Sequence, residues 1–506
     1  STAKTHTTHH QSVSHRYNLF EIPPQLCSLL FSSSRFPQLC SCLLANIMLS
    51  SARVTASRLL SGASAFRPTS SPLFRAFSTS SLSPHASSGA SSSPVPRSIF
   101  SSTSVSSASA HSSTPSSLCH QSTSPRQSVT SYSAVRGATE LTKDDIVQEL
   151  LPEEKRRQPP ENYLQLNFGE HFTDHMFMVE YDANVKGGSW HSPKIVPYQP
   201  LKLDPAALVL HYGQEAFEGM KAYGHQDGKV ALFRPRDNFL RLNQTNHRLA
   251  MPPLDEEFMV EAVKELVRVD SRWVPHVPLA SVYIRPTVIA NEAVLGVKVS
   301  KKYLCYVIMC PSGPYFKSGF EPVDILVNEA YTRASLRGLG AAKTASNYAA
   351  AILAEHECKK EGFAQCLYLD SVERRYVEEI GAMNVFFVLD GKELITPRLT
   401  GSILAGITRR TVLELGEYWG LRVTERRTSI KEVIRGIQSG RVTEAFGTGT
   451  AAAICPIGMI QYRGTKYEIN QHKTGPVARR LFDHITGVQA GKVEDEFNWL
   501  EYVNVE

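Results

Sequence analysis

The length and composition of this chain place it among folded proteins with more than one hydrophobic core, since it has 506 residues of which 42% are hydrophobic. Its formal net charge is +6, and residues 1–139 alone carry +9, from ten Lys or Arg against one Glu. Residues 140–506 therefore carry −3. A mildly acidic remainder gives no electrostatic reason to expect a nucleic-acid partner.

Residues 1–139 are predicted to be a disordered leader. From Ile22 to Thr139 there is no Asp, Glu or Lys, but there are eight Arg among many Ser, Pro and Ala. Such a segment cannot bury enough apolar surface to fold. From about Met48, Arg residues spaced among Leu, Ala and Ser are typical of an organellar transit peptide. We expect import into the mitochondrial matrix.

Two other interpretations of the leader remain. The apolar patch at residues 39–49 has the length of a signal-peptide core, so a two-part leader for a plastid-type organelle is the alternative address. An unstructured low-complexity arm without a targeting role is the other. The patch is too short to span a bilayer, and we expect no membrane partner.

The remainder is predicted to form two domains of mixed α/β structure, a smaller one at 140–316 and a larger one at 326–506. A linker rich in Pro and Gly, 317–325, separates them. In the first domain, strands are predicted at 229–235, 281–290 and 302–310. A helix is predicted to start after the N-cap residue Asp255, with one apolar face.

The second domain contains two further local signals. Residues 384–396 form two apolar runs joined at Asp390-Gly391, which predicts a β-hairpin. Ser429 with Glu432 three residues later predicts a capping box at the start of a helix. Five of the nine Cys lie in residues 140–506 without CxxC spacing, which argues against a zinc site or a disulfide framework.

One lysine stands out by its position. The stretch RGLGAAKTASNYAAAILAEHECKKEG places Lys343 in a loop of small residues before an alanine-rich helix. We expect Ser346 or Asn347 to cap this helix, Tyr348 to begin it and Gly362 to end it. The positive end of the helix dipole would then favour a neutral amine, which is a nucleophile toward carbonyls. Taken alone, an exposed loop lysine is the commoner case.

A longer motif selects this lysine. Residues 379–410, EIGAMNVFFVLDGKELITPRLTGSILAGITRR, resemble the signature of class IV pyridoxal-phosphate aminotransferases. The segments LHYGQEAFEGMKAY, LFRPRDNFLRLN, YIRPTVIANEAVLGV, AKTASNY and EAFGTGTAAAI resemble, in this order, the branched-chain amino acid aminotransferases. The resemblance covers nearly all of residues 165–506. It implies a two-domain fold of type IV, like that of D-amino acid aminotransferase, and a homodimer.

The resemblance also implies the cofactor, pyridoxal 5'-phosphate, and the residues that hold it. Lys343 is implied to bind it covalently and then to carry the proton of the reaction. Glu379 is implied to pair with the pyridine nitrogen, and Tyr348 with the phenolic oxygen. The implied phosphate-binding residues are Arg241, Ile407, Thr408 and Thr450.

The implied substrate pocket combines aromatic walls with one arginine. The walls are assigned to Tyr212, Phe217, Tyr283 and Tyr315. Arg285 is assigned to the second carboxylate of glutamate, and the backbone amides of Thr450 and Ala451 are candidates for the α-carboxylate of the substrate. An apolar pocket distinguishes aliphatic side chains poorly, since one methylene is worth about 1–3 kcal/mol. We therefore expect Leu, Ile and Val all to be substrates.

Two other functions stay open at this point. One is a different activity on the same fold, a D-amino acid aminotransferase or an aminodeoxychorismate lyase. The other is a binding or scaffold protein without catalysis, which we would expect to lack Lys343, Glu379 or Arg241. All three residues are present.

Overall fold

The structure is a computed structural model that describes residues 141–185, 187–314 and 319–505. All of them belong to one compact unit, residues 122–506. The predicted leader, residues 1–139, lies outside the described residues, as does Tyr315. The described part is a mixed α/β structure built around two sheets.

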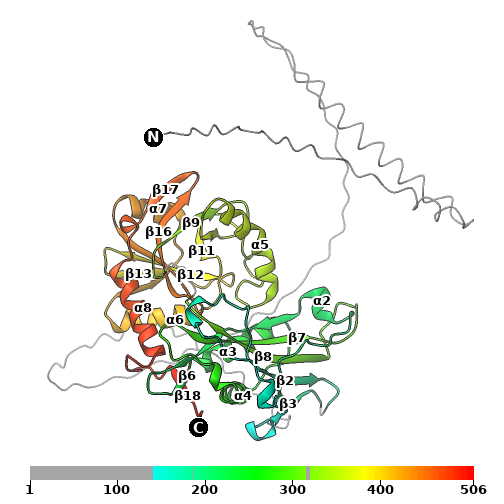
Figure 1. The fold of residues 1–506 in the computed structure, drawn as a ribbon. Helices are drawn as coiled ribbons and strands as arrows, with labels where there is room; N and C mark the ends of the chain where they lie inside the picture. The colour runs from blue at the N-terminus through cyan, green and yellow to red at the C-terminus, as the bar shows by residue number, and fades with distance from the viewer. Residues whose placement is uncertain (1–140, 186, 315–318, 506) are drawn as a thin grey trace, which may run out of the picture. The chain divides into compact units, whose positions relative to one another are not determined.

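The first sheet has the strand order β1-β3-β2-β8-β7-β5-β6-β18, and β4 pairs with β7; its strands are cyan and green in Figure 1 except β18, which is red. Its strands are β1 (Val147–Gln148), β2 (His175–Asp182), β3 (Ser189–Pro197), β4 (Glu215–Phe217), β5 (Met220–Gly224), β6 (Val230–Phe233), β7 (Ser281–Ala290), β8 (Lys302–Ser312) and β18 (Leu500–Val503). The helices of this half are α2 (Leu208–Tyr212), α3 (Pro235–Arg248) and α4 (Glu256–Val269). Its central strands pair antiparallel.

The second sheet has the order β11-β10-β9-β16-β15-β12-β13-β14, with β17 on β16. Its strands are β9 (Val323–Asn328), β10 (Gln365–Leu369), β11 (Val377–Ile380), β12 (Met383–Leu389), β13 (Glu393–Thr396), β14 (Arg422–Glu425), β15 (Val442–Gly449), β16 (Ala453–Tyr462) and β17 (Thr465–Glu468). The accompanying helices are α5 (Ala345–Lys360), α6 (Ile407–Tyr418), α7 (Ile430–Gln438) and α8 (Pro476–Gln489). Parallel and antiparallel pairs are mixed in this sheet.

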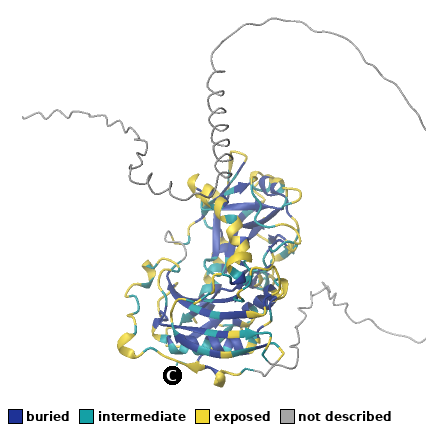
Figure 2. Ribbon diagram, turned by 90° about the vertical axis from the view of Figure 1, so that its right-hand side faces the viewer, coloured by how far each residue is buried: buried dark blue, intermediate teal, exposed yellow. Residues whose placement is uncertain are grey.

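The cores follow this division. One apolar cluster joins the first sheet to α3 and α4. A second lies between the other sheet and α7, and a third packs α6 and α8 against strands that include β12 and β15. Figure 2 shows the buried residues concentrated in the strands. The two faces of the second sheet are thus both covered, which is expected for a sheet that contains parallel strands.

The local signals in the sequence are confirmed where periodicity and caps agree. Strand β7 has the predicted bounds, and the Asp255 carboxylate accepts a hydrogen bond from the Phe258 amide at 2.7 Å, which caps α4. The hairpin β12–β13 turns at Asp390 (φ +51°) and Gly391 (φ +67°). Two successive positive φ angles are what a tight hairpin turn requires.

The predicted capping box forms only in part. The Ser429 hydroxyl accepts from the Glu432 amide at 3.2 Å, so the cap of α7 is confirmed. The Glu432 carboxylate instead accepts a hydrogen bond from Arg426 at 2.6 Å. The Glu432 side chain therefore binds Arg426, which lies outside the helix, and does not complete the capping box.

Two strands, β9 and β18, do not follow the predicted domain boundaries. β9 begins at Val323, inside the predicted linker 317–325. β18, which belongs by sequence to the second domain, pairs antiparallel with β6 and so completes an edge of the first sheet. β18 and β6 lie beside each other in Figure 1. The division into two domains stays a prediction, and the chain returns to the first sheet at its end.

Among the described residues, no helix is both long enough and apolar enough to cross a membrane.

Candidate active site

Lys343 lies in the loop that leads into α5, and two elements of the first half fix its backbone. Its amide donates to the Thr245 hydroxyl of α3 at 3.0 Å, and its carbonyl accepts from the Phe217 amide at 3.0 Å. The loop needs small residues because it passes close to other backbone: a Cβ on Gly340 would lie 2.1 Å from the Ser402 carbonyl oxygen. The lysine is therefore held where the two halves of the molecule meet.

The start of α5 differs from the prediction. The helix begins at Ala345, with Thr344 at the cap position, so Ser346 and Asn347 lie in the first turn and cap nothing. The Ala345 amide donates instead to the carboxylate of Glu215 in β4 at 2.8 Å. The expected cap is wrong because a residue distant in sequence performs this role.

Asn347 binds the loop before α5, and the end of α5 is as predicted. Its side-chain amide donates to the carbonyls of Leu339 and Ala342, both at 2.8 Å, and so stabilises the lysine loop. The helix ends at Lys360, and Gly362 follows with φ +89°. Glycine suits this position because it adopts a left-handed backbone without strain.

The amine of Lys343 faces aromatic side chains. Its Nζ donates to the Tyr348 hydroxyl at 3.1 Å and lies 4.8 Å from the centre of the Phe217 ring. The rings of Phe217 and Tyr348 are 5.1 Å apart. The structure thus brings together three residues that the sequence assigned to the site.

Strand β7 adds two more of the predicted residues. Arg285 lies with its guanidinium carbon 4.7 Å from the Phe217 ring centre, and its Nη2 donates to the Tyr283 hydroxyl at 3.2 Å. The Arg285 Nε is buried and has no hydrogen-bond partner among the described residues. Gly219 permits this arrangement, because a Cβ there would lie 1.8 Å from the Tyr283 hydroxyl oxygen. One aromatic pocket with one cation at its side results.

Glu379 is buried in β11, directly opposite Asn384 in β12. Its Oε1 accepts a hydrogen bond from the Asn384 side chain at 2.9 Å. Burial raises the pKa of Glu379 to about 7, although the neighbouring Arg333 guanidinium opposes this shift. The Oε2 atom forms an ion pair with Arg333 but has no hydrogen-bond partner among the described residues. A carboxylate oxygen has two lone pairs, so Oε2 can accept a hydrogen bond from a further donor beside Arg333.

Arg241, in α3, is held by a buried carboxylate. Its Nε and Nη2 donate to the two oxygens of Glu218 at 2.7 and 2.8 Å, and its Nη1 donates to the Ala405 carbonyl at 3.0 Å. Burial disfavours the charge on Arg241, but Glu218 outweighs burial and raises the pKa of the guanidinium. Two of its five N–H groups remain for another acceptor.

Arg241 points to the N-terminus of α6. Gly406 is the cap residue, and Ile407 and Thr408 form the first turn. The first N–H groups of a helix have no partners within it, so they attract anions. Glycine is needed before this turn because a Cβ on Gly406 would lie 2.1 Å from the side-chain oxygen of Asn384.

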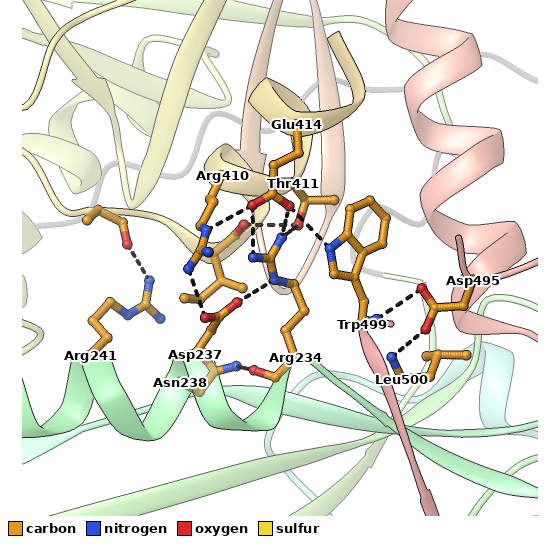
Figure 3. Close-up of polar contacts among 12 residues, drawn as sticks. Arg234, Asp237, Asn238, Arg241, Arg410, Thr411, Glu414, Asp495, Trp499 and Leu500 are labelled. Atoms are coloured by element: carbon orange, nitrogen blue, oxygen red, sulfur yellow. Dashed lines mark hydrogen bonds and ion pairs between the residues drawn. The ribbon is translucent and has the colours of Figure 1, made fainter. Parts of the chain in front are cut away.

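A network of charged groups holds α3 against α6, as Figure 3 shows. Arg234, at the start of α3, donates to Asp237 at 2.5 Å and to Glu414 of α6 at 2.6 Å. Arg410 of α6 donates to the same two carboxylates, at 2.8 Å to Asp237 and 2.9 Å to Glu414. The indole N–H of Trp499 also donates to Glu414, at 3.2 Å. The network fixes the distance between Arg241 and the α6 N-terminus.

Two predicted site residues, Thr450 and Ala451, form the turn between β15 and β16, which starts after the pair Gly449–Ala453. Both are partly buried. Tyr212 is exposed, and its hydroxyl donates to the Leu295 carbonyl, so its contacts do not link it to the aromatic pocket. Its assignment to the pocket stays a prediction, as does that of Tyr315.

Sequence reasoning missed two charged residues. Glu218 holds Arg241, and Arg333 contacts Glu379. Glu218 lies within the segment LHYGQEAFEGMKAY, but nothing in that segment shows which distant arginine it meets. Arg333 stands ten residues before Lys343 and carries no local motif.

Comparison with known proteins decides the family. The model of amino-transferase class IV matches residues 215–460. Branched-chain-amino-acid aminotransferase 2 of Bacillus subtilis (strain 168) is 48% identical over 363 residues, which are 72% of this chain and 98% of that protein. The chain belongs to the branched-chain aminotransferases of class IV.

Solved structures of this family agree. A branched-chain amino acid aminotransferase from Escherichia coli is 26% identical with a TM-score of 0.55, and the match covers 65% of this chain and 99% of that one. The enzyme of Thermobaculum terrenum in its holo-form with the cofactor is 26% identical with a TM-score of 0.54, over 65% of this chain and 98% of that one. The class IV fold expected from the sequence is confirmed.

As a class IV aminotransferase, this chain is an enzyme that depends on pyridoxal 5'-phosphate. The described residues fit this cofactor. Lys343 offers an amine, Glu379 offers a buried oxygen without a hydrogen-bond partner, and the first turn of α6 offers N–H groups beside Arg241. These groups match a carbonyl, a ring N–H and a phosphate, respectively.

Proposed function

We propose that this aminotransferase transfers the amino group of L-leucine, L-isoleucine or L-valine reversibly to 2-oxoglutarate, giving branched-chain 2-oxo acids and L-glutamate by a ping-pong mechanism. One observation carries the proposal: the Lys343 amine lies against the Phe217 ring, and Arg285 contacts the same ring from β7. An apolar side chain and a second carboxylate can both be accommodated there.

The roles of the cofactor-binding residues follow from their chemistry. Pyridoxal 5'-phosphate, when bound, supplies an electron-withdrawing ring that stabilises the charge left after the α-proton is removed. Glu379 would accept the ring N–H at Oε2. Arg241, Ile407, Thr408 and Thr450 would hold the phosphate. The Tyr348 hydroxyl lies 3.1 Å from Lys343 Nζ. It would form a hydrogen bond with the phenolic oxygen of the cofactor.

Lys343 would carry the proton. Its amine lies 4.8 Å from the Phe217 ring centre, beside the aromatic pocket where the α-carbon of an amino acid must lie for its side chain to contact Phe217 and Tyr283. The amides of Thr450 and Ala451 would bind the α-carboxylate. Arg285 would bind the γ-carboxylate of glutamate, because its guanidinium lies against the Phe217 ring and its Nε has no hydrogen-bond partner among the described residues.

Turnover of amino acids tests this assignment. The purified protein, supplied with pyridoxal 5'-phosphate and 2-oxoglutarate, is expected to form glutamate from L-leucine, L-isoleucine and L-valine at rates within about 100-fold of one another, since one methylene is worth about 1–3 kcal/mol. D-Alanine is the matched alternative donor. Turnover of D-alanine without turnover of L-leucine would move the activity to the D-amino acid aminotransferases.

A homodimer is the assembly that we infer for this enzyme. Large apolar side chains are exposed on α5, where Ile352 is 67% and Leu353 51% exposed. The loop after β7 exposes Val297 at 82%. Large apolar side chains exposed at the surface favour association with another chain. Light scattering is expected to give twice the mass of the chain, and Ile352→Glu with Leu353→Glu is expected to give the monomer.

The mitochondrial matrix is the proposed location, with a plastid-type organelle as the alternative. The arginine-rich, acid-free composition of residues 22–139 supports the proposal. A fluorescent protein fused after residue 139 is expected to enter mitochondria. Import into plastids would select the alternative, and a diffuse cytosolic signal would contradict both.

A further inference from the structure

Lys221 is a buried lysine close to the proposed substrate site. It lies in β5, is only 8% exposed, and donates from Nζ to the Ala451 carbonyl at 3.0 Å. No carboxylate forms an ion pair with it among the residues that the structure describes. A buried ammonium without a carboxylate partner is costly, so its position calls for a functional explanation.

The register of the first sheet directs Lys221 toward the site. It is paired with Tyr283 of β7, and Tyr283 is paired with Cys310 of β8. Directly paired residues of antiparallel strands extend from the same face of a sheet. Lys221 therefore extends from the face that carries the pocket residue Tyr283, and its amine reaches across to the turn between β15 and β16.

The cavity beside Lys221 is lined by further basic side chains. Lys221 and residues Thr450 to Ala453 line one cavity, together with His276, Arg479 and Lys492. No Asp or Glu is among the described residues that line it. Besides the imidazole of His276, the guanidinium of Arg479 and the ammonium of Lys492, the titratable groups facing Lys221 are the Cys310 thiol and the hydroxyls of Tyr283 and Tyr223. Arg479 is paired with Asp483 at 3.9 Å. Lys221 has no such partner among the described residues, so its charge can act on an anion held at the Thr450–Ala451 turn.

We propose that Lys221 positions the substrate carboxylate, because its ammonium holds the Ala451 carbonyl and so fixes the turn whose amides receive that carboxylate. This inference rests on the proposed function, which assigns the Thr450–Ala451 turn to the α-carboxylate. The turn lies beyond the last strand pair, Gly449–Ala453, and needs another contact to fix its peptide planes. Lys221 supplies this contact and adds electrostatic attraction for the anion.

The protonation state of the Lys221 amine predicts that carboxylate binding depends on pH. Burial lowers the pKa of Lys221 to about 8, with a small opposing effect of Cys310. Below this pKa the amine is charged and donates strongly. Above it, the neutral amine is a weaker donor and no longer attracts a carboxylate. The affinity for carboxylate ligands should therefore fall as the pH rises through about 8.

The experiment uses 4-methylvalerate, a carboxylate that cannot donate an amino group, as the probe. Its Kd for the holoenzyme is measured by calorimetry from about pH 6.5 to 9.5 for the wild type, Lys221→Met and Lys221→Arg. Lys229→Met is the matched control, since Lys229 is exposed in the neighbouring segment and pairs with Asp227. KM and kcat for L-leucine are measured in parallel.

The wild type is expected to lose affinity by about 10-fold or more above pH 8, whereas Lys221→Arg stays charged and keeps its affinity. Lys221→Met is expected to raise Kd and KM by about 10-fold or more at pH 7, with a smaller change in kcat. Unchanged binding in Lys221→Met, or identical pH profiles for the wild type and Lys221→Arg, would overturn the inference. If Lys221→Met does not fold, the comparison of the pH profiles of the wild type and Lys221→Arg still tests the inference. A wild type that neither binds the probe nor reacts with L-leucine would instead overturn the proposed function, and the inference with it.

Discussion

The guanidinium of Arg241 and the carboxylate of Glu218 form a buried pair joined by two parallel hydrogen bonds, 2.7 and 2.8 Å long. Glu218 is fully buried and Arg241 is 6% exposed. The pair joins α3 to the segment between β4 and β5, and its geometry fixes the plane of the guanidinium beside the first turn of α6. Arg241 is therefore oriented before any phosphate binds.

Replacing Glu218 tests the importance of this pair. Glu218→Gln leaves the Arg241 charge buried without its counter-charge, so we expect the free energy of unfolding to fall by about 3–5 kcal/mol. Urea denaturation measures the change. Asp227→Asn, which removes the partner of the exposed Lys229, is the control and should leave stability almost unchanged. Equal, small effects of both substitutions would show that the buried pair does not stabilise the fold.

The raised pKa of Glu379 predicts a pH dependence of stability in the cofactor-free protein. A carboxyl group with a pKa of about 7 in the folded state, against about 4.5 in the unfolded state, binds its proton more tightly when folded. Its contribution is fully present below the unfolded pKa and is lost as the pH rises through about 7. The wild type should therefore lose stability relative to Glu379→Gln between about pH 5 and 8. A difference that stays constant over this range would contradict the raised pKa.

Glu379→Gln should also slow catalysis. Loss of the negative charge beside the ring nitrogen is expected to lower kcat by about 100-fold or more, the range seen when one preorganised electrostatic group is removed. Glu378→Gln is the control, because Glu378 is also a buried carboxylate but accepts from the Ser402 hydroxyl. If both variants lose kcat equally, the effect arises from disturbed packing and not from the role of Glu379.

Gly219→Ala tests the shape of the pocket. The added Cβ would lie 1.8 Å from the Tyr283 hydroxyl oxygen, so this ring must move and its hydrogen bond with Arg285 must break. We expect KM for L-leucine and 2-oxoglutarate to rise, in steady-state kinetics. Gly296→Ala is the control, since its Cβ would meet no atom within 4 Å. An unchanged KM in Gly219→Ala would remove Tyr283 from the pocket.

Arg285→Met separates the two kinds of substrate. If Arg285 binds the second carboxylate, kcat/KM for glutamate should fall by about 10-fold or more, while that for L-leucine changes less, because a charge-assisted hydrogen bond is worth about 1.5–3 kcal/mol. The two half-reactions can be followed separately by stopped-flow absorbance. An equal loss for leucine and glutamate would assign Arg285 to the structure of the pocket.

The sequence predicted those features that are encoded locally. Asp255 caps α4 and Asp390-Gly391 turns a hairpin because the signal and the structure lie within a few residues of each other. The cap of α5 was misplaced, because Glu215 of β4 binds its first amide and Asn347 serves the preceding loop. The pairing of β18 with β6 depends on contacts across about 270 residues, and no local pattern reports it.

The site could be predicted only as far as the family motif reaches. Lys343, Phe217, Tyr348, Tyr283 and Arg285 are brought together as the resemblance implied. The supporting charges could not be assigned from sequence, because each pairs with a residue on another element.

The central claim is that Lys343 binds pyridoxal 5'-phosphate and uses it to take the amino group of L-leucine. The most direct measurement is the visible absorption of the purified protein with the cofactor, before and after L-leucine is added without an acceptor. We predict a yellow band that disappears on addition of leucine and returns with 2-oxoglutarate, and that is absent in Lys343→Ala but present in the control Lys360→Ala. A band that leucine leaves unchanged, or a Lys343→Ala variant that retains full transamination, would contradict the account.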